Sequence, residues 1–313
     1  MILRPLLAIA AAALLLACGG GETSSPAEAA TAVCRAKAGA DEQLACFTAL
    51  YGVTPLEAPP VVSDARFAAG VRLFTSTRLS GTGTVACVSC HANNNAGVEG
   101  FTLLDGRTLA RALHPSLRGG DADDPANTTS IHRNAPDLVN KLLGAPQFMF
   151  HDGRVAADGK GGFITPVGDQ LPPGLENLVA AQALVPLLAR DEMLGYAPGS
   201  NAGRSENTLA GLASDPVEAD PQPVWNAVMQ RVLADPALAG GLAEAFPEVA
   251  PASLGIQHVA NALAAFQTRR WNAGRSTYGF HGWLRDRARW PLAADELRGA
   301  LTFFDRGRCA QCH

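Results

Sequence analysis

Two Cys-x-x-Cys-His segments, at residues 87–91 and 309–313, contain the side chains of this chain that are best suited to chemistry. Two cysteines at this spacing can each form a thioether with one haem vinyl group, and the adjacent histidine can ligate the iron. A zinc site or unrelated cysteines are the alternative. The spacing therefore predicts two covalently bound haem c groups, held by Cys87, Cys90, His91, Cys309, Cys312 and His313.

The second of these segments ends at the last residue of the sequence. A haem needs surrounding helices as well as an attachment loop. We therefore expect a second haem domain that continues beyond His313 and that supplies the remaining ligand of the second iron.

The N-terminal residues have the features of a secretory signal. Arg4 precedes an apolar run over residues 5–17, which is too short to span a membrane as a helix. Residues 15–18, Leu-Leu-Ala-Cys, resemble a bacterial lipobox, in which Cys18 is lipidated and becomes the first residue. Ordinary cleavage near this point, with Cys18 incidental, is the alternative. We expect a signal peptide over residues 1–18 and a periplasmic protein that is anchored to the outer membrane only by lipid.

Cys34 and Cys46 remain once lipid and haem have accounted for the other cysteines. Disulfides persist in exported proteins, so we predict that these two residues pair and close a short helical hairpin over residues 32–51. A metal or redox pair is the alternative, although no histidine lies nearby in the sequence. Residues 19–60 are thus expected to form a tether followed by this hairpin.

The composition is that of a globular protein with a sizeable core. Hydrophobic residues make up 47% of the chain and charged residues 17%, with a formal net charge of −4. The chain is not basic enough to indicate nucleic-acid binding.

Helical periodicity dominates the remaining sequence, with no convincing run of alternating strand residues. Segments rich in Gly and Pro at residues 119–127, 158–174 and 197–220 are predicted to be loops. The predicted helices cover residues 64–74, 224–233, 238–246, 252–271 and 294–304.

A weak internal repeat indicates a duplicated architecture. Residues 67–74, before the first attachment loop, parallel residues 297–304, before the second, because each segment is an apolar helix that contains Gly. The predicted fold is all-α, with two c-type cytochrome domains that each enclose a haem. The first covers residues 61–285, and the second begins in residues 286–313.

Several segments, taken in order, resemble the bacterial di-haem cytochrome c peroxidase and MauG-type family. The resemblance runs from about residue 64 to residue 313, and its segments are specific as a set although each is weak alone. They are residues 72–91 (Arg-Leu-Phe to Cys-His), 133–140 (Arg-Asn-Ala-Pro), 150–154 (Phe-His-Asp-Gly-Arg), 182–193 and 260–266.

The resemblance implies roles for individual residues. His91 would ligate the haem that reacts with hydrogen peroxide, and the second haem would relay electrons. Glu192 and Gln182 match a carboxylate and an amide on the peroxide side of the first haem. A carboxylate there can move a proton between the peroxide oxygens, and an amide can hold the peroxide in line. Asn134 matches a residue that helps to bind calcium between the haems, for which an amide oxygen is a suitable ligand; a turn-capping Asn is the alternative.

The chain departs from the family pattern at several histidines. His151 stands where many members have a tryptophan between the haems, so it could contact a haem carboxylate, occupy the relay position or ligate an iron. His114 and His132 both lie in the interval where some members have a distal histidine ligand, but neither aligns cleanly. If neither ligates, the first haem would be active without prior reduction.

Three functions remain open from the sequence. The first is an exported peroxidase that reduces hydrogen peroxide with electrons from a small cytochrome c or a cupredoxin. The second is a MauG-like oxidase that modifies a protein tryptophan. The third is an electron-transfer cytochrome without an open iron site.

Overall fold

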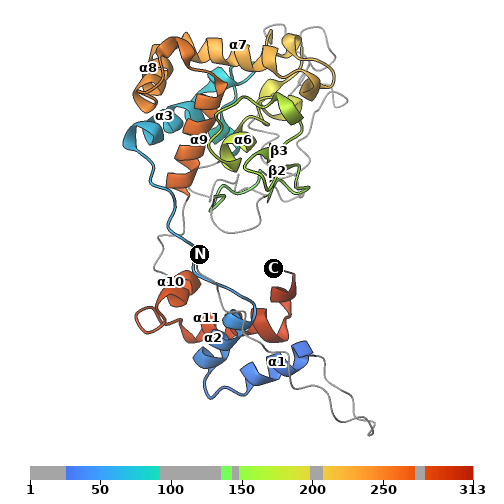
Figure 1. Cartoon of the computed structure of the whole chain (residues 1–313), viewed down its shortest axis with the longest axis vertical. Coiled ribbons are helices and arrows are strands. Elements are labelled where there is room, and N and C mark those ends of the chain that lie inside the picture. The colour runs from blue at the N-terminus through green and yellow to red at the C-terminus, as the bar shows by residue number, and fades with distance from the viewer. Residues whose placement is uncertain (1–25, 92–134, 143–147, 198–206, 272–278, 313) are drawn as a thin grey trace, which may run out of the picture. The chain divides into compact units, whose positions relative to one another are not determined.

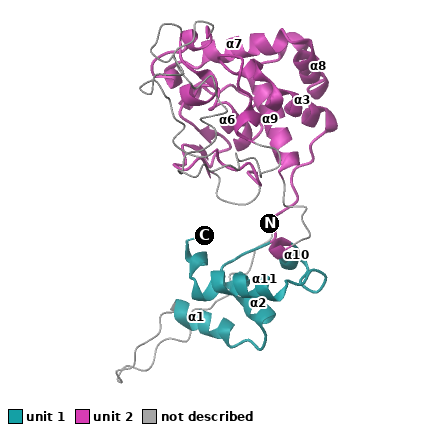
Figure 2. Cartoon of the chain, turned by 180° about the vertical axis from the view of Figure 1, so that it is seen from behind, with its two compact units in different colours: residues 1–54, 282–313 teal, residues 55–281 magenta. Residues whose placement is uncertain are grey.

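The computed structural model describes residues 26–91, 135–142, 148–197, 207–271 and 279–312. The chain divides into two compact units, which Figure 2 shows in different colours. Unit 1 combines residues 1–54 with residues 282–313, and unit 2 covers residues 55–281. This division differs from the predicted domains at 19–60, 61–285 and 286–313, because the N-terminal segment shares a unit with the C-terminal one.

Unit 2 is mainly helical, in agreement with the predicted fold class, and α3 and α9 form its centre. In Figure 1 these two helices lie side by side although they are far apart in the sequence. Ser63 caps α3, since its hydroxyl accepts a hydrogen bond from the Arg66 backbone N–H at 3.2 Å. The longer helices of the unit are α3 (Asp64–Thr75), α6 (Leu178–Ala183), α7 (Gln222–Leu233), α8 (Pro236–Ala245) and α9 (Ile256–Arg270).

A glycine lets α3 and α9 approach closely. A Cβ atom added at Gly70 would overlap the Ala262 carbonyl group and the Phe266 side chain. One turn further along α3, the rings of Phe74 and Phe266 lie 4.7 Å apart, centroid to centroid. These contacts make the helix pair the rigid support for the first attachment loop, which follows α3 in the chain.

A small antiparallel sheet, which the sequence analysis did not predict, lies in unit 2. It has the order β1-β2-β3 and pairs Met149 with Val155 and Ala156 with Ile164. Its strands are too short for an alternating pattern to be recognised in the sequence. They are β1 (Phe148–Met149), β2 (Val155–Ala157) and β3 (Phe163–Ile164).

Short helical turns connect the longer elements of unit 2. Several of them fall in segments that were predicted to be loops. They are η1 (Thr77–Leu79), α4 (Cys87–Cys90), η3 (Gly168–Gln170), η4 (Arg190–Leu194), η5 (Ala210–Leu212), η6 (Val217–Ala219) and η7 (Pro251–Ser253).

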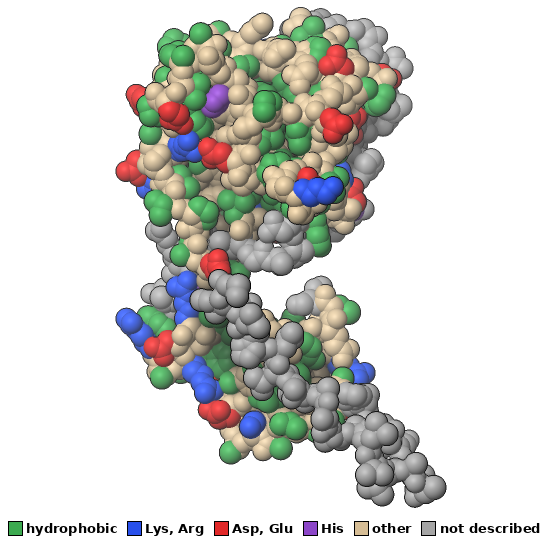
Figure 3. Space-filling model, viewed as in Figure 1, with side chains coloured by type: hydrophobic (Ala, Val, Ile, Leu, Met, Phe, Trp, Pro, Cys, Tyr) green, Lys and Arg blue, Asp and Glu red, His purple; other side chains and the backbone are tan. Residues whose placement is uncertain are grey.

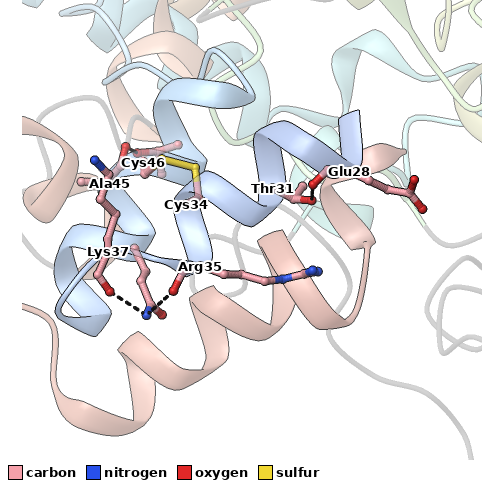
Figure 4. Close-up of a disulfide and its surroundings, with 9 residues drawn as sticks. Glu28, Thr31, Cys34, Arg35, Lys37, Ala45 and Cys46 are labelled. Carbon is pink, nitrogen blue, oxygen red and sulfur yellow. Dashed lines mark hydrogen bonds between the residues drawn. A yellow bond between two sulfur atoms is a disulfide. The ribbon is translucent and has the colours of Figure 1, made fainter. Parts of the chain in front are cut away.

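Unit 1 contains the predicted helical hairpin. A disulfide joins Cys34 to Cys46, with their Cα atoms 5.3 Å apart, and Figure 4 shows it linking the two helices of the hairpin. The helices of unit 1 are α1 (Pro26–Arg35), α2 (Ala40–Leu50), α11 (Ala294–Leu301), η8 (Thr302–Arg306) and η9 (Cys309–Gln311), together with the end of α10 (Gly279–Arg285).

The surface charge and the lengths of the helices can be described for the residues that the structure covers. On the face shown in Figure 3, acidic and basic side chains are interspersed with hydrophobic and uncharged ones. Within the described ranges, every helix is too short or too polar to pass through a membrane.

Candidate active site

The first attachment loop is a single helical turn, α4, that ends at His91. The His91 backbone N–H donates to the Cys87 carbonyl at 2.9 Å, and the Ser89 hydroxyl accepts from the Ala86 N–H at 3.1 Å. Residues three apart in a helix lie on the same side, so the turn presents Cys87 and Cys90 together. This is the arrangement that two thioethers to one ring require.

The described residues around this loop do not form a zinc ligand set. Cys87 is half-buried, and burial raises the pKa of its thiol to about 12. Zinc usually takes four protein ligands in a structural site. In the part of the chain that the structure describes, no three His, Cys, Asp or Glu side chains are grouped so that they could hold a metal ion.

An aromatic cluster borders His91. The Phe74 ring lies 6.3 Å from the His91 ring and 5.5 Å from Trp271, and Trp271 lies 5.2 Å from Phe266, all between centroids. The buried Trp271 Nε1 and Gln267 Oε1 have no hydrogen-bond partner among the described residues. Because buried polar groups nearly always have partners, these two fit a site completed by a bound group with polar substituents.

The loop before the first cysteine is tied to the turn that carries Glu192. The Gly81 N–H donates to the Met193 carbonyl at 2.7 Å. The fully buried Asn207 donates from Nδ2 to the next carbonyl, that of Leu194, at 2.9 Å. On the other side, Arg231 Nη1 donates to the Ser80 carbonyl at 2.7 Å. These bonds fix the position of the turn that carries Glu192 relative to the segment before Cys87.

Glu192 lies in η4, a π-helical turn, and its side chain is half-buried. Burial raises the pKa of the Glu192 carboxyl; the positive charge of Arg154 opposes this increase, and the negative charge of Asp191 adds to it. Asp191 itself accepts a hydrogen bond from the Tyr196 hydroxyl at 2.7 Å. A desolvated carboxylate with a raised pKa beside a cation is suited to proton transfer.

Arg154 is fixed by its own segment. Its guanidinium lies 3.9 Å from the centre of the Phe150 ring, and its Nη1 donates to Asp152 Oδ2 at 3.0 Å. Gly153 between them has a φ of 70°, in the left-handed region that favours glycine. Residues 150–154 stand out in the sequence, but nothing in the sequence predicts that Arg154 acts on the Glu192 carboxyl.

Gln182 and His151 line one cavity of about 740 Å³, a size typical of ligand sites. Gln182 comes from α6 and is half-buried, whereas His151 is exposed. The other lining residues are mostly apolar and come from residues 135–138, Lys141 and residues 148–150. The described lining of this cavity includes Gln182 but not Glu192.

Several residues predicted from the sequence lie outside the described residues, namely Cys18, His114, His132, Asn134 and His313. In the second loop, Cys309 is half-buried and Cys312 is exposed, both in or beside η9. Three residues of this site were not predicted from the sequence, namely Arg154, Asn207 and Arg231. Of these, only Arg154 lies in a segment that carries the resemblance, residues 150–154.

Comparisons with known proteins complete the description of this site. A model of the family described as di-haem cytochrome c peroxidase matches residues 64–287. Among solved structures, a MauG-like protein associated with microbial copper homeostasis is 21% identical, with a TM-score of 0.44, over 82% of this chain and 55% of its own. The diheme peroxidase BthA from Burkholderia thailandensis is 19% identical, with a TM-score of 0.45, over 81% and 50%.

This chain thus spans about half the length of these solved proteins. No curated protein matches it.

Proposed function

Because the chain belongs to the di-haem cytochrome c peroxidase family, we propose that it reduces hydrogen peroxide to water with electrons relayed from a second haem. Family membership makes it an oxidoreductase with haem cofactors. In this proposal Cys87, Cys90 and His91 hold the reactive haem covalently. Cys309, Cys312 and His313 hold the electron-relaying one.

The observation that carries the proposal is the placement of Glu192. Its turn is hydrogen-bonded, through Met193 and Leu194, to Gly81 and Asn207 beside the first attachment loop. A carboxylate on a merely exposed helix end would have neither this anchoring nor a raised pKa. The anchoring therefore supports a role for Glu192 in chemistry at the first haem.

The reaction consumes hydrogen peroxide, two electrons and two protons and yields two water molecules. When bound, the haem iron supplies a site for peroxide and a route for electrons. The Glu192 carboxylate takes the proton from the peroxide oxygen nearer the iron and returns it to the farther oxygen, so that water can leave. The positive charge of Arg154 favours the ionised form of this carboxylate and so opposes the effect of burial on its pKa. Gln182 orients peroxide from the cavity that it lines.

The remaining parts of the proposal concern supply and location. A small cytochrome c or a cupredoxin delivers electrons to the second haem. Asn134 contributes an amide oxygen to a calcium site between the haems. Export to the periplasm and a lipid on Cys18 attach the protein to the outer membrane. Replacing Cys18 with Ser should abolish labelling by a radioactive fatty acid, and unchanged labelling would reject the anchor.

Glu192→Gln tests the catalytic assignment. The amide keeps the shape of the side chain but cannot accept the proton, so we expect peroxide turnover with a reduced cytochrome to fall by roughly 10²–10⁴-fold. The control is Glu244→Gln, because Glu244 is an exposed carboxylate on α8. Absorbance spectra should show the same haem content in both variants. Wild-type turnover in Glu192→Gln would reject the assignment.

The same purified protein separates the other two functions. A high-spin ferric haem with rapid peroxide turnover would support the peroxidase. Slow turnover with oxidation of a protein tryptophan would support the MauG-like oxidase. Two low-spin haems that do not react with peroxide in any redox state would leave only electron transfer.

A further inference from the structure

The contacts within unit 1 point to a role for its N-terminal hairpin. We propose that the disulfide-closed hairpin α1–α2 is the positioning element for the second attachment loop, so that haem attachment at Cys309 and Cys312 depends on residues 26–51. This inference rests on the proposed function in one respect, namely that both loops bind haem covalently.

The first contact joins the hairpin to the turn directly before the loop. Arg35 donates from Nε and Nη2 to Asp305 Oδ1, at 2.8 and 2.5 Å. The Asp305 side chain is only 15% exposed, so its charge is largely withdrawn from water and needs this partner. The Asp305 backbone carbonyl in turn accepts from the Arg308 N–H at 3.2 Å. Asp305 thus connects the hairpin to Arg308, which directly precedes Cys309.

Arg308 gives the entry to the loop a costly backbone conformation. Its φ is 55°, in the left-handed region that residues other than glycine rarely adopt. Such a conformation costs free energy and persists where the surroundings impose it. Here the Gly307 N–H donates to the Thr302 carbonyl at 2.7 Å and the Arg308 N–H to the Asp305 carbonyl at 3.2 Å, so the position of Asp305, which Arg35 holds, bears on this conformation. The chain enters Cys309 directly from this residue.

An apolar contact supports the same turn. Phe304 is buried, and its ring lies 5.8 Å from that of Tyr51, the residue that follows α2. Leu44 and Phe47, on the inner face of α2, are also fully buried. The hairpin therefore supplies core side chains to unit 1, in which α2 packs against α11 and η8.

A second polar contact attaches the start of α2 to the segment before α11. Trp283 is buried and donates from Nε1 to Asp41 Oδ1 at 2.6 Å. Arg287 Nη1 lies 3.3 Å from Asp41 Oδ2 and 3.2 Å from Glu42 Oε1. The two ends of the C-terminal segment are thus held by different parts of the hairpin.

The disulfide keeps these parts together. Arg35 is the last residue of α1, next to Cys34, whereas Tyr51 and Asp41 belong to α2 or adjoin it. A ten-residue helix such as α1 is only marginally stable alone in water. Its disulfide to α2 therefore determines where Arg35 lies. Gln43 Nε2 adds bonds to the Arg35 and Lys37 carbonyls, both at 3.1 Å, which Figure 4 shows as dashed lines.

The consequence concerns attachment of the second haem. Each thioether forms when a cysteine thiol adds across a haem vinyl group: an S–C bond forms, the thiol hydrogen moves to the vinyl group, and no oxidant is consumed. The reaction needs the two thiols and the vinyl groups to be in position together. Without the hairpin, Asp305 loses Arg35 and Phe304 loses its contact with the Tyr51 ring, so the turn that leads into Cys309 is no longer held in place.

The test compares the two loops within one molecule. The full chain is produced in a host that attaches haem c, as wild type, as Cys34→Ser/Cys46→Ser and as Arg35→Met. Arg269→Met is the matched control, since Arg269 forms an exposed ion pair with Asp64 in unit 2. Mass spectrometry of proteolytic peptides then gives the haem-bearing fraction of each loop.

We expect the fraction at residues 309–313, relative to that at residues 87–91, to fall at least fivefold in the double variant. A smaller fall is expected in Arg35→Met, and none in Arg269→Met. An unchanged ratio in both hairpin variants would overturn the inference. An equal loss at both loops would also overturn it, because the hairpin would then stabilise the whole chain without selecting the second loop. Absence of haem from both loops of the wild type would instead reject the proposed function.

Discussion

Replacing Gly81 with alanine should uncouple Glu192 from the first attachment loop. A Cβ atom at residue 81 would collide with the Leu194 carbonyl oxygen and would lie 2.6 Å from Asn207 Oδ1 and 2.8 Å from its Nδ2. Neither neighbour can move freely, because Asn207 is fully buried and bonded to both the Leu194 carbonyl and the Ala210 N–H.

The size of the effect follows from these distances. An ordinary contact with a Cβ needs at least 3.4 Å, so the Asn207 amide must move by about 0.8 Å, and the Leu194 carbonyl oxygen, which lies closer still, must move further. A misplacement of roughly 1 Å in a catalytic site can cost on the order of 10²-fold in rate. We therefore expect kcat for peroxide reduction to fall by about 10–10²-fold. Overpacking should also lower the free energy of unfolding by about 1–3 kcal/mol.

The assay is steady-state peroxide reduction with a reduced cytochrome donor, together with thermal unfolding and haem content. Gly211→Ala is the control, because a Cβ at Gly211 meets no atom within 4 Å. Haem should be retained in both variants. Wild-type kcat and unchanged stability in Gly81→Ala would refute the close-packing argument, and equal losses in both variants would refute the specific link to Glu192.

Two further predictions concern the helix core and the pH dependence. Gly70→Ala should lower the free energy of unfolding in urea by about 1–3 kcal/mol, since the new Cβ would overlap the Ala262 carbonyl, whereas Gly240→Ala, in open space on α8, should be neutral or slightly stabilising. Arg154→Met should raise the pKa of the Glu192 carboxyl further, because the cation that favours its ionised form is lost. The proton-accepting carboxylate would then disappear at a higher pH, and the acidic limb of kcat/KM should move upward; an unmoved limb would contradict the coupling.

The helices that the sequence predicted best are those with a long apolar stripe. Residues 64–74 were predicted to be helical, and α3 covers Asp64–Thr75. The predicted helix at residues 252–271 begins later, at Ile256, because Pro251–Ser253 forms a separate 3-10 turn. The small sheet was missed because strands of two or three residues carry no readable period.

The candidate active site was predictable only in part. Glu192 and Gln182 were predicted through a resemblance, while Asn207 and Arg231 have no local sequence signal. Asn207 matters because it bonds the Leu194 carbonyl and fills the space beside Gly81. Nothing in the sequence around Asn207 distinguishes it from other loop asparagines. Its role follows from contacts with residues that are distant in the sequence.

The sequence by itself determined where the two Cys-x-x-Cys-His segments lie and so the prediction of haem attachment, because thioether formation and iron ligation would use residues that are adjacent in the chain. It also determined the main helices, whose apolar stripes repeat locally. The tertiary structure alone decided that the turn carrying Glu192 is bonded, through the Met193 carbonyl, to Gly81 before Cys87, and that Arg35 reaches Asp305 at the other end of the chain. Those contacts join residues that are distant in the sequence, and they form only when the folded elements pack together. No local sequence pattern predicts them.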